Sequence, residues 1–341
     1  MTTTPEYAMP YDIHIAGTDV HFPCEPGQNV LDAALKSGIE MPYSCRKGIC
    51  GNCAGRVTAG SVECPPPGAQ IEADQRLLCQ CLPLEDLEIA PASWHRLDPS
   101  ARKTYTVKVF RNTLAAPDVN VLQLRLPAGQ RAKFRAGQYL QVTLPDGSRR
   151  AYSMANPPHE SDMLQLHIRH VAGGRFTQLV PPLKSGDTLQ VQLSVGHKEE
   201  QAEAQAPLLC VAGGTGFAPV KSLLDDLMKK ASGRPVTLVW GARTPDGLYL
   251  MPAVERWKKS LPGFRFVPAI EDEAGAQAAG GFHGRADNAV RSLFAGGLAG
   301  HEVYCCGAPA MVAAVRKTCV EELGLDAHRF FADVFVPGPA A

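Results

Sequence analysis

Four cysteines have the spacing that metal or redox chemistry requires. In the segment PYSCRKGICGNCAGRV, Cys45, Cys50 and Cys53 follow a C-x4-C-x2-C pattern, and Cys79 comes later in RLLCQCLP. This is the spacing of thiolates that hold one kind of [2Fe–2S] cluster. Structural zinc sites prefer two close pairs of ligands, so zinc is a weaker interpretation, and a disulfide framework is weaker still.

The fourth cluster ligand is ambiguous between Cys79 and Cys81. The segment RLLCQCLP reads as extended, and alternate residues of a strand point to the same side. Cys24 and Cys64 are not expected to be ligands. The chain holds 11 cysteines, an odd number, so they cannot all pair within one chain. We expect many of the others, such as Cys210 and Cys319, to be small apolar residues.

A glycine-rich turn is a second chemical feature. The segment LLCVAGGTGFAP reads as a buried strand, a turn and the start of a helix. Gly213, Gly214 and Gly216, with Thr215 between them, allow the backbone to approach a pyrophosphate at a helix N-terminus. Pro219 suits an early helical position, where a missing N–H costs nothing. The turn therefore predicts a nucleotide site.

Three blocks of different periodicity must position these groups. The chain has 341 residues, too many for one ordinary core. Residues 10–93 read as a small α+β domain and 94–102 as a polar linker. Residues 103–200 hold six alternating strands and a short helix at 175–186, which predicts an antiparallel β-barrel. Residues 201–341 alternate strands with helices, which predicts a doubly wound parallel sheet.

Charge is unevenly distributed, although the net charge is zero. Residues 1–95 hold 5 Lys+Arg and 12 Asp+Glu, which argues against a nucleic-acid partner for the first block. The helix predicted in PVKSLLDDLMKK carries two i,i+4 ion pairs, Asp225 with Lys229 and Asp226 with Lys230. No apolar run approaches the roughly 18–20 residues that a membrane helix needs, and no secretory signal opens the sequence, so we expect a cytoplasmic protein without a membrane partner.

The cysteine loop resembles that of plant-type ferredoxins. In that family the last ligand lies in an L-x-C segment with a proline four residues later, which here is residues 77–79 with Pro83. The resemblance implies a [2Fe–2S] β-grasp domain with Cys79 as the fourth ligand.

The second block resembles the flavin domain of the ferredoxin–NADP reductase superfamily. The segment RRAYSMANPP matches its first signature, which implies that Arg150 faces the flavin pyrophosphate, Tyr152 lies along the isoalloxazine or ribityl chain, and Ser153 sits near flavin N5. The segment GGRFTQL resembles its second signature, which implies that Gly174 and Thr177 hold phosphate at a helix N-terminus. FAD is the flavin that the domain order implies.

The third block resembles the nicotinamide domain of the same superfamily, through GGTGFAP and CGAP. The resemblance implies that Cys306 and Gly307 lie beside the nicotinamide, with Cys306 and Ser153 next to the reacting atoms. Arg243 follows the second strand, where it would bind the 2′-phosphate of NADPH, but a lone arginine is equally compatible with NADH. Phe335 is the candidate for the C-terminal aromatic that this superfamily often stacks on the flavin.

The order of the three blocks resembles the reductase components of bacterial ring-hydroxylating dioxygenases. It implies that NAD(P)H delivers two electrons as hydride to FAD, which passes them singly to the cluster. The implied acceptor is a Rieske-type oxygenase component. Two alternatives remain open. One is the same electron chain serving deoxysugar synthesis or another aromatic-acid oxygenase. The other is a redox-sensing or cluster-binding module fused to a non-catalytic α/β partner.

Overall fold

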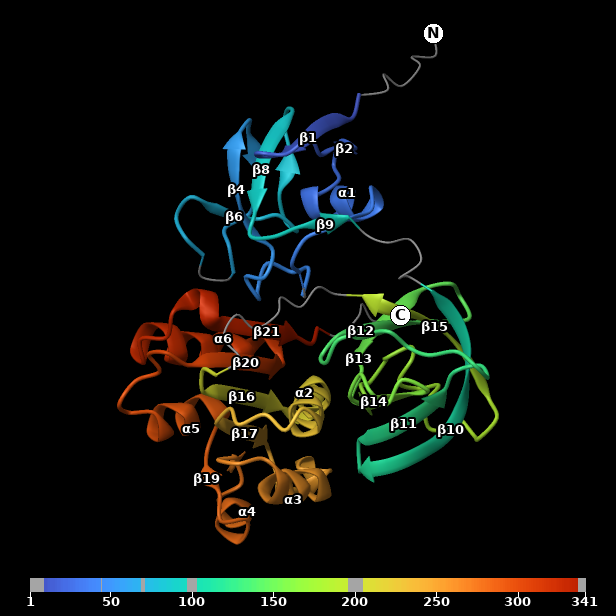
Figure 1. Ribbon diagram of the computed structural model, residues 1–341, viewed down its shortest axis with the longest axis vertical. Coiled ribbons are helices and arrows are strands. Elements are labelled where there is room, and N and C mark those ends of the chain that lie inside the picture. The colour runs from blue at the N-terminus through green and yellow to red at the C-terminus, as the bar shows by residue number, and fades with distance from the viewer. Residues whose placement is uncertain (1–8, 44, 69–70, 97–102, 196–204, 337–341) are drawn as a thin grey trace. The chain divides into compact units, whose positions relative to one another are not determined.

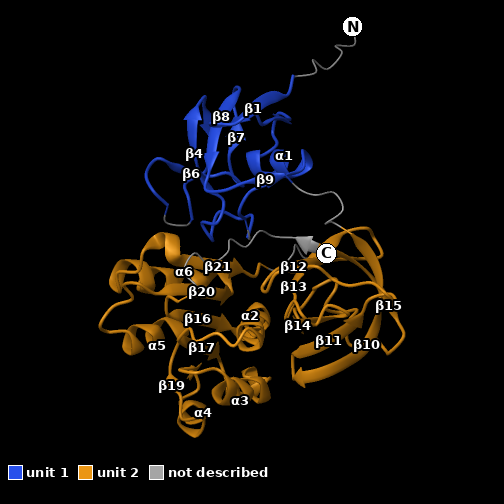
Figure 2. Ribbon diagram, viewed as in Figure 1, with its two compact units in different colours: residues 1–99 blue, residues 100–341 orange. Residues whose placement is uncertain are grey.

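Five stretches of the chain are described by the computed structural model: residues 9–43, 45–68, 71–96, 103–195 and 205–336. The chain divides into two compact units (Figure 1), residues 1–99 and residues 100–341, which Figure 2 colours separately. The division falls within the predicted linker 94–102, most of which lies outside the described residues. The boundary expected at 200/201 also lies outside them, and the two predicted domains on either side of it belong to one unit.

The first unit has the predicted α+β fold, and its described residues form one helix and a mixed sheet (Figure 1). Its main sheet has the order β2-β1-β8-β4-β6, in which only β1 and β8 run parallel. Two short antiparallel ladders, β3-β9 and β5-β7, complete it. The elements are β1 (Tyr11–Ile15), β2 (His21–Cys24), α1 (Val30–Lys36), β3 (Ile39–Glu40), β4 (Ala54–Ala59), β5 (Val62–Glu63), β6 (Gln75–Leu77), β7 (Leu82–Pro83), β8 (Leu87–Pro91) and β9 (His95–Arg96).

Helix α1 begins at a capped end that also holds a distant segment. The Asn29 side chain accepts a hydrogen bond of 2.9 Å from a backbone N–H of the first turn. Val30 and Leu31 are fully buried, and their N–H groups, which have no partner within the helix, donate to the carbonyls of Cys81 (3.0 Å) and Leu78 (3.1 Å). The helix start thereby fixes the segment that contains the last cysteines.

Strand β9 departs from the predicted linker. His95 and Arg96 pair antiparallel with Ile39 and Glu40, and the His95 imidazole lies 3.3 Å from the buried Glu40 carboxylate. A ladder of two residues has no apolar alternation, so the sequence carried no periodic signal for it.

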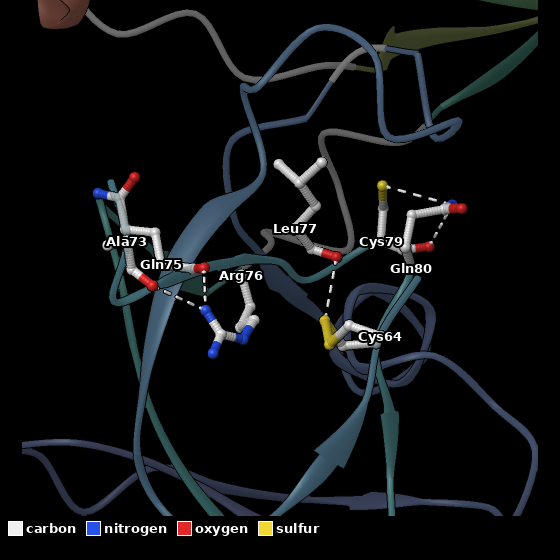
Figure 3. Close-up of a disulfide and its surroundings, with 8 residues drawn as sticks. Cys64, Ala73, Gln75, Arg76, Leu77, Cys79 and Gln80 are labelled. Atoms are coloured by element: carbon white, nitrogen blue, oxygen red, sulfur yellow. Dashed lines mark hydrogen bonds between the residues drawn. A yellow bond between two sulfur atoms is a disulfide. The ribbon is translucent and has the colours of Figure 1, made fainter. Parts of the chain in front are cut away.

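A disulfide joins Cys64 to Cys81 (Figure 3), a pairing that the sequence did not predict. Strands β5 and β7 pair Glu63 with Leu82, so the two cysteines occupy the next cross-strand position. Their Cα atoms are 4.4 Å apart, within the range that a disulfide requires. The pairing comes from strand register across 17 residues, which no cysteine spacing reveals.

The second unit begins with the predicted antiparallel barrel. Its strand order is β13-β12-β15-β10-β11-β14, so β13 and β14 are the two ends of the ladder, and they approach each other without hydrogen bonding. Alternate residues such as Leu122, Leu140 and Leu166 fill the interior. The strands are β10 (Thr104–Ala116), β11 (Val119–Arg125), β12 (Tyr139–Thr143), β13 (Arg149–Ser153), β14 (Met163–Arg169) and β15 (Thr188–Val195).

The helix predicted at 175–186 does not form. The segment is a run of turns closed by i→i+3 and i→i+4 backbone hydrogen bonds. Pro181 and Pro182 lack the N–H donors that a helix needs, which stops it. Phe176 and Val180 are nevertheless buried, and their four-residue spacing produced the helical pattern.

The rest of the second unit is the predicted doubly wound sheet. Six parallel strands have the order β19-β18-β17-β16-β20-β21. No helix in the described ranges is long and apolar enough to cross a membrane. The elements are β16 (Leu208–Gly213), η1 (Gly214–Gly216), α2 (Phe217–Lys229), β17 (Val236–Ala242), η2 (Pro245–Gly247), α3 (Met251–Ser260), β18 (Arg265–Ile270), α4 (Glu273–Ala278), β19 (Phe282–His283), α5 (Ala286–Leu293), β20 (Glu302–Gly307), α6 (Pro309–Lys317), η3 (Thr318–Glu322), η4 (Ala327–Arg329) and β21 (Phe330–Val334).

The two ion pairs predicted on α2 have different outcomes. Lys230 lies 2.8 Å from Asp226, as predicted. Asp225 is instead buried, and its carboxylate lies 2.9 Å from Nζ of Lys221, one turn earlier in the helix. The polar pattern did not reveal that this side of the helix is covered by other parts of the unit.

We expect the substitution Cys64→Ser to lower the free energy of unfolding of the first unit by about 3 kcal/mol, because the disulfide restricts a loop of this length in the unfolded chain. Denaturant unfolding of the cluster-loaded protein, with and without a phosphine reductant, measures the change. The reductant should destabilise the wild type and leave the variant unaffected. Equal unfolding midpoints for the variant and the oxidised wild type would contradict this expectation.

Candidate functional site

The four cysteines of the predicted cluster site come together in the first unit. Cys45, Cys50, Cys53 and Cys79 are all buried. Their thiols associate in two pairs, with one hydrogen bond between Cys45 and Cys50 and another between Cys53 and Cys79. Four thiolates are what the two irons of a [2Fe–2S] cluster need. The described ranges contain no group of three or more His, Cys, Asp or Glu side chains, these cysteines included, whose arrangement could hold a single metal ion.

Backbone N–H groups surround the sulfur of Cys45. Those of Lys47, Ile49 and Cys50 lie 3.3, 3.4 and 3.4 Å from Sγ. The loop can curl around the sulfur because Gly48 adopts a φ of +73°, which favours glycine. A hydrogen bond from the Cys50 thiol, helped by these N–H groups, lowers the pKa of Cys45 to about 5. The surroundings of Cys45 thus favour its thiolate, the form that binds iron.

Cys79 and Cys81 point to different sides of their segment. Residues 78–80 form a turn, closed by a backbone hydrogen bond of 2.7 Å, and not the extended segment that was expected. Cys81 is bonded to Cys64, while the Cys79 sulfur lies on the other side (Figure 3). A hydrogen bond from the Cys53 thiol lowers the pKa of Cys79 to about 7, against the effect of burial. The structure thus brings Cys79, and not Cys81, beside the other three cysteines.

Arg46 connects the cysteine loop to two neighbouring segments. Its guanidinium forms an ion pair with Asp32 of α1. Its carbonyl accepts a hydrogen bond of 3.2 Å from the side-chain amide of Gln80, whose nitrogen also lies 3.7 Å from the Cys79 sulfur. Arg46 therefore helps to hold the loop against the turn that carries the fourth cysteine.

The first flavin signature lies on β13, an end strand of the barrel. Ser153 is its last residue and is partly exposed. The Tyr152 ring lies 5.1 Å from the Phe176 ring, and burial raises the pKa of Tyr152 to about 12, which keeps its hydroxyl protonated. Arg150 is partly exposed and donates 2.9 Å to the carbonyl of Arg149. The strand offers a cation, a phenol and a hydroxyl, which suit the phosphates and ring system of a flavin.

The second flavin signature forms a closed turn. The Thr177 hydroxyl lies 3.3 Å from the N–H of Val171, which donates to it, and 3.1 Å from the carbonyl of Gly174. A Cβ at position 174 would lie 2.4 Å from that hydroxyl oxygen, so only glycine fits. The hydroxyl of Thr177 thus shapes the turn, and the helix N-terminus expected here to hold phosphate is absent from this segment.

The predicted nucleotide loop connects β16 to α2. A Cβ at Gly216 would lie 2.0 Å from the carbonyl oxygen of Cys306, and one at Gly213 would lie 2.4 Å from the sulfur of Met311. The loop backbone therefore packs directly on the end of β20 and the start of α6. The residues of the loop are Gly213, Gly214, Thr215 and Gly216.

A cavity of about 550 Å³ opens at the carboxyl ends of the parallel strands. Gly213, Gly214 and Arg243 line it, and Arg243 is exposed. The barrel contributes Arg169, whose Nη1 would lie 3.0 Å from a Cβ on Gly214 and whose Nε lies 3.2 Å from Asp118. Both halves of the second unit therefore build this cavity, which has the glycine loop and the cations that a dinucleotide requires.

Several charged residues of the cavity were missed by sequence reasoning, among them Glu271 and Arg285. The Arg285 guanidinium is held by Asp287 through contacts of 3.0 and 3.1 Å. Glu271 follows β18 directly and Arg285 lies two residues after β19. Their place after parallel strands was the signal that could have found them.

The predicted nicotinamide residues lie at the ends of β20 and β21. The Cys306 side chain is fully buried in the core of the parallel-sheet domain, so its backbone carbonyl, and not its thiol, meets the glycine loop. The N–H of Phe335 donates 2.8 Å to the carbonyl of Gly307. The strand pairing thereby brings Phe335 beside Gly307.

Known families match the chain in three parts. The family described as "2Fe-2S iron-sulfur cluster binding domain" matches residues 13–84, "Oxidoreductase FAD-binding domain" matches 106–199, and "Oxidoreductase NAD-binding domain" matches 210–317. The predicted cofactors, a [2Fe–2S] cluster, FAD and NAD(P)H, are confirmed by these matches, and the chain is an electron-transfer oxidoreductase.

Similarity to individual proteins extends over nearly the whole chain. It is 54% identical to reductase component 2 of terephthalate 1,2-dioxygenase from Comamonas sp, over 97% of this chain and 99% of that one. It is 32% identical to the CDP-6-deoxy-L-threo-D-glycero-4-hexulose-3-dehydrase reductase of Yersinia pseudotuberculosis, over 96% and 99%. A solved cytochrome P450 reductase from Amycolatopsis has a TM-score of 0.72 at 30% identity, over 97% of this chain and 100% of that one. The chain belongs to the family of iron–sulfur flavoprotein oxidoreductases that includes the reductase components of terephthalate 1,2-dioxygenase.

Proposed function

We propose that this chain passes electrons from NAD(P)H, through FAD and its [2Fe–2S] cluster, to the Rieske-type oxygenase component of a terephthalate 1,2-dioxygenase. The observation that carries the proposal is the 54% identity to a reductase of that enzyme over 99% of its length. The sugar-dehydrase reductase is only 32% identical over the same extent. When bound, FAD accepts two electrons as hydride and releases them one at a time, as a one-electron cluster requires.

The chain's own residues have distinct tasks in this proposal. The four cysteines bind the irons, and the N–H groups around the Cys45 sulfur offset part of the negative charge there. Arg150 offsets phosphate charge, while Tyr152 and Ser153 line the flavin ring. The glycine loop and Arg169 receive the nicotinamide nucleotide in the cavity that they share. The cluster ligands are Cys45, Cys50, Cys53 and Cys79.

We place the chain in the cytoplasm because its electron donor, NAD(P)H, is an intracellular coenzyme. The Cys64–Cys81 disulfide is unusual for that compartment, where glutathione and thioredoxin keep most thiols reduced. Cell fractionation tests the location, and thiol alkylation before lysis tests whether the disulfide exists in the cell. Recovery of the chain outside the cytoplasm would overturn the assignment.

Anaerobic titration with NADH or NADPH tests the electron route. We expect the flavin absorbance to bleach and a rhombic electron paramagnetic resonance signal of a reduced [2Fe–2S] cluster to appear. Reconstitution with the terephthalate oxygenase component should then give oxygenated product. Reduction of ferricyanide without product, or better coupling to the sugar dehydrase in a parallel assay, would reject the proposed acceptor.

We expect Cys79→Ser to abolish the cluster signal, because it removes one of the four converging thiolates, while NAD(P)H-dependent ferricyanide reduction by the flavin continues. The matched control is Cys81→Ser, two residues away, which breaks the disulfide and should keep the cluster. Iron content and low-temperature paramagnetic resonance measure both variants. Loss of the cluster from the Cys81 variant alone would reverse the assignment.

We expect Arg243→Ala to lower kcat/KM for NADPH roughly 10-fold more than for NADH, since a charge-assisted hydrogen bond to a 2′-phosphate exists only with NADPH. Arg285→Ala serves as the comparison, because its guanidinium is already held by Asp287. Steady-state measurement of kcat/KM with NADPH and with NADH, for both variants and the wild type, tests this expectation. An equal loss with both would show that Arg243 does not read the 2′ position.

A further inference from the structure

Two neighbouring side chains of helix α2 hold two neighbouring carbonyls of the barrel. Lys221 Nζ donates to the carbonyl of Ala155 at 3.1 Å, and the Ser222 hydroxyl donates to the carbonyl of Asn156 at 2.7 Å. All four residues are buried. These contacts join parts of the chain that are 66 residues apart in sequence.

The barrel segment that receives these bonds is itself held in one conformation. The N–H of Ala155 donates 2.7 Å to the carbonyl of Gln165. The Asn156 side chain donates to the carbonyls of Glu160 (2.9 Å) and Met163 (2.8 Å) and accepts 2.8 Å from the N–H of Gln165. A displacement of α2 is therefore transmitted to the strand end and is not absorbed by a loose loop.

The ammonium of Lys221 is paired with a buried carboxylate that has fixed hydrogen-bond partners of its own. The Asp225 carboxylate lies 2.9 Å from Nζ and also accepts hydrogen bonds from Arg256 (2.7 Å) and from the indole of Trp257 (2.8 Å). A buried charge with this many fixed partners keeps one geometry. The network thus connects α2, α3 and the end of β13.

The position of these contacts along the chain points to their role. Ala155 lies two residues after Ser153, the end of the flavin strand, and Lys221 lies five residues after Gly216, about 7.5 Å along a helix. Helix α2 therefore follows the nucleotide loop directly, and one turn later its side chains bind the backbone just after the flavin strand. Neither side chain lines the nucleotide cavity.

We propose that Lys221 and Ser222 are positioning residues that set the approach of the nicotinamide ring to the flavin. The step they serve is the transfer of a hydride, two electrons and one proton, which oxidises NAD(P)H and reduces the flavin. A misplacement of about 1 Å can slow such a step roughly 100-fold. This inference rests on the flavin and nucleotide sites of the proposed function.

Three variants of the full-length holoprotein test the inference. Ser222→Ala removes one hydroxyl, Lys221→Met removes the ammonium, and Lys221→Arg keeps a charged donor and should restore most of the function. The matched control is Lys230→Met, which removes the ion pair between Asp226 and the exposed lysine that caps the end of the same helix. Ser222→Ala is a small change that keeps the test valid if Lys221→Met does not fold.

Anaerobic stopped-flow measurement of flavin bleaching separates positioning from binding. We expect the rate constant for hydride transfer to fall roughly 10- to 100-fold in Ser222→Ala and Lys221→Met, with the Kd of the nucleotide changed by less than about two-fold. The charge-transfer absorbance between nucleotide and flavin should weaken in parallel. In the flavin-free protein, amide hydrogen exchange at residues 154–156 should become faster. Lys230→Met should match the wild type in every measurement.

Two results would overturn the inference while leaving the proposed function intact. One is hydride transfer within two-fold of the wild type in both variants. The other is a lower rate of hydride transfer that is fully explained by weaker nucleotide binding or by a lower melting temperature, while the charge-transfer absorbance is unchanged. If neither nucleotide bleaches the wild-type flavin, the proposed function fails as well, and this inference fails with it.

Discussion

The close approach of a loop to a strand end is the constraint on which the second unit depends. The loop after β16 and the end of β20 meet so tightly that a single methyl group at Gly216 would overlap the carbonyl of Cys306. Parallel pairing of these strands, with Ala212 opposite Cys306, brings the loop and the strand end to the same edge of the sheet. The cavity opens at this edge.

Helix α2 connects this edge of the sheet to the barrel. Its first residues follow the glycine loop, and one turn later its buried lysine and serine hold the strand end beyond the flavin signature. The flavin and nicotinamide domains, which differ in periodicity and look separate in sequence, therefore form one compact unit. Hydride transfer needs that arrangement, since its rate depends on the fixed separation of two bound rings.

The first unit solves a different problem, which is to hold a fourth sulfur that is distant in sequence from the other three. The turn that carries Cys79 is fixed on both sides. The start of α1 donates hydrogen bonds to the carbonyls of Leu78 and Cys81, and the disulfide joins Cys81 to Cys64. These contacts and the N–H groups around the Cys45 sulfur together hold the four sulfurs close to one another before any iron is bound.

The sequence by itself determined the features that depend on local spacing: the three clustered cysteines, the glycine loop, the alternation of barrel strands and the order of the domains. Short-range periodicity and side-chain chemistry are enough for those. The family resemblance already implied Cys79, and not Cys81, as the fourth ligand. Only the tertiary structure decided that Cys64 finds a partner, that the Cys306 side chain is buried in the core, and that Asp225 pairs with Lys221. Each of these depends on which distant segment covers a given side of a strand or helix. The neighbouring residues in the sequence do not specify which segment that is.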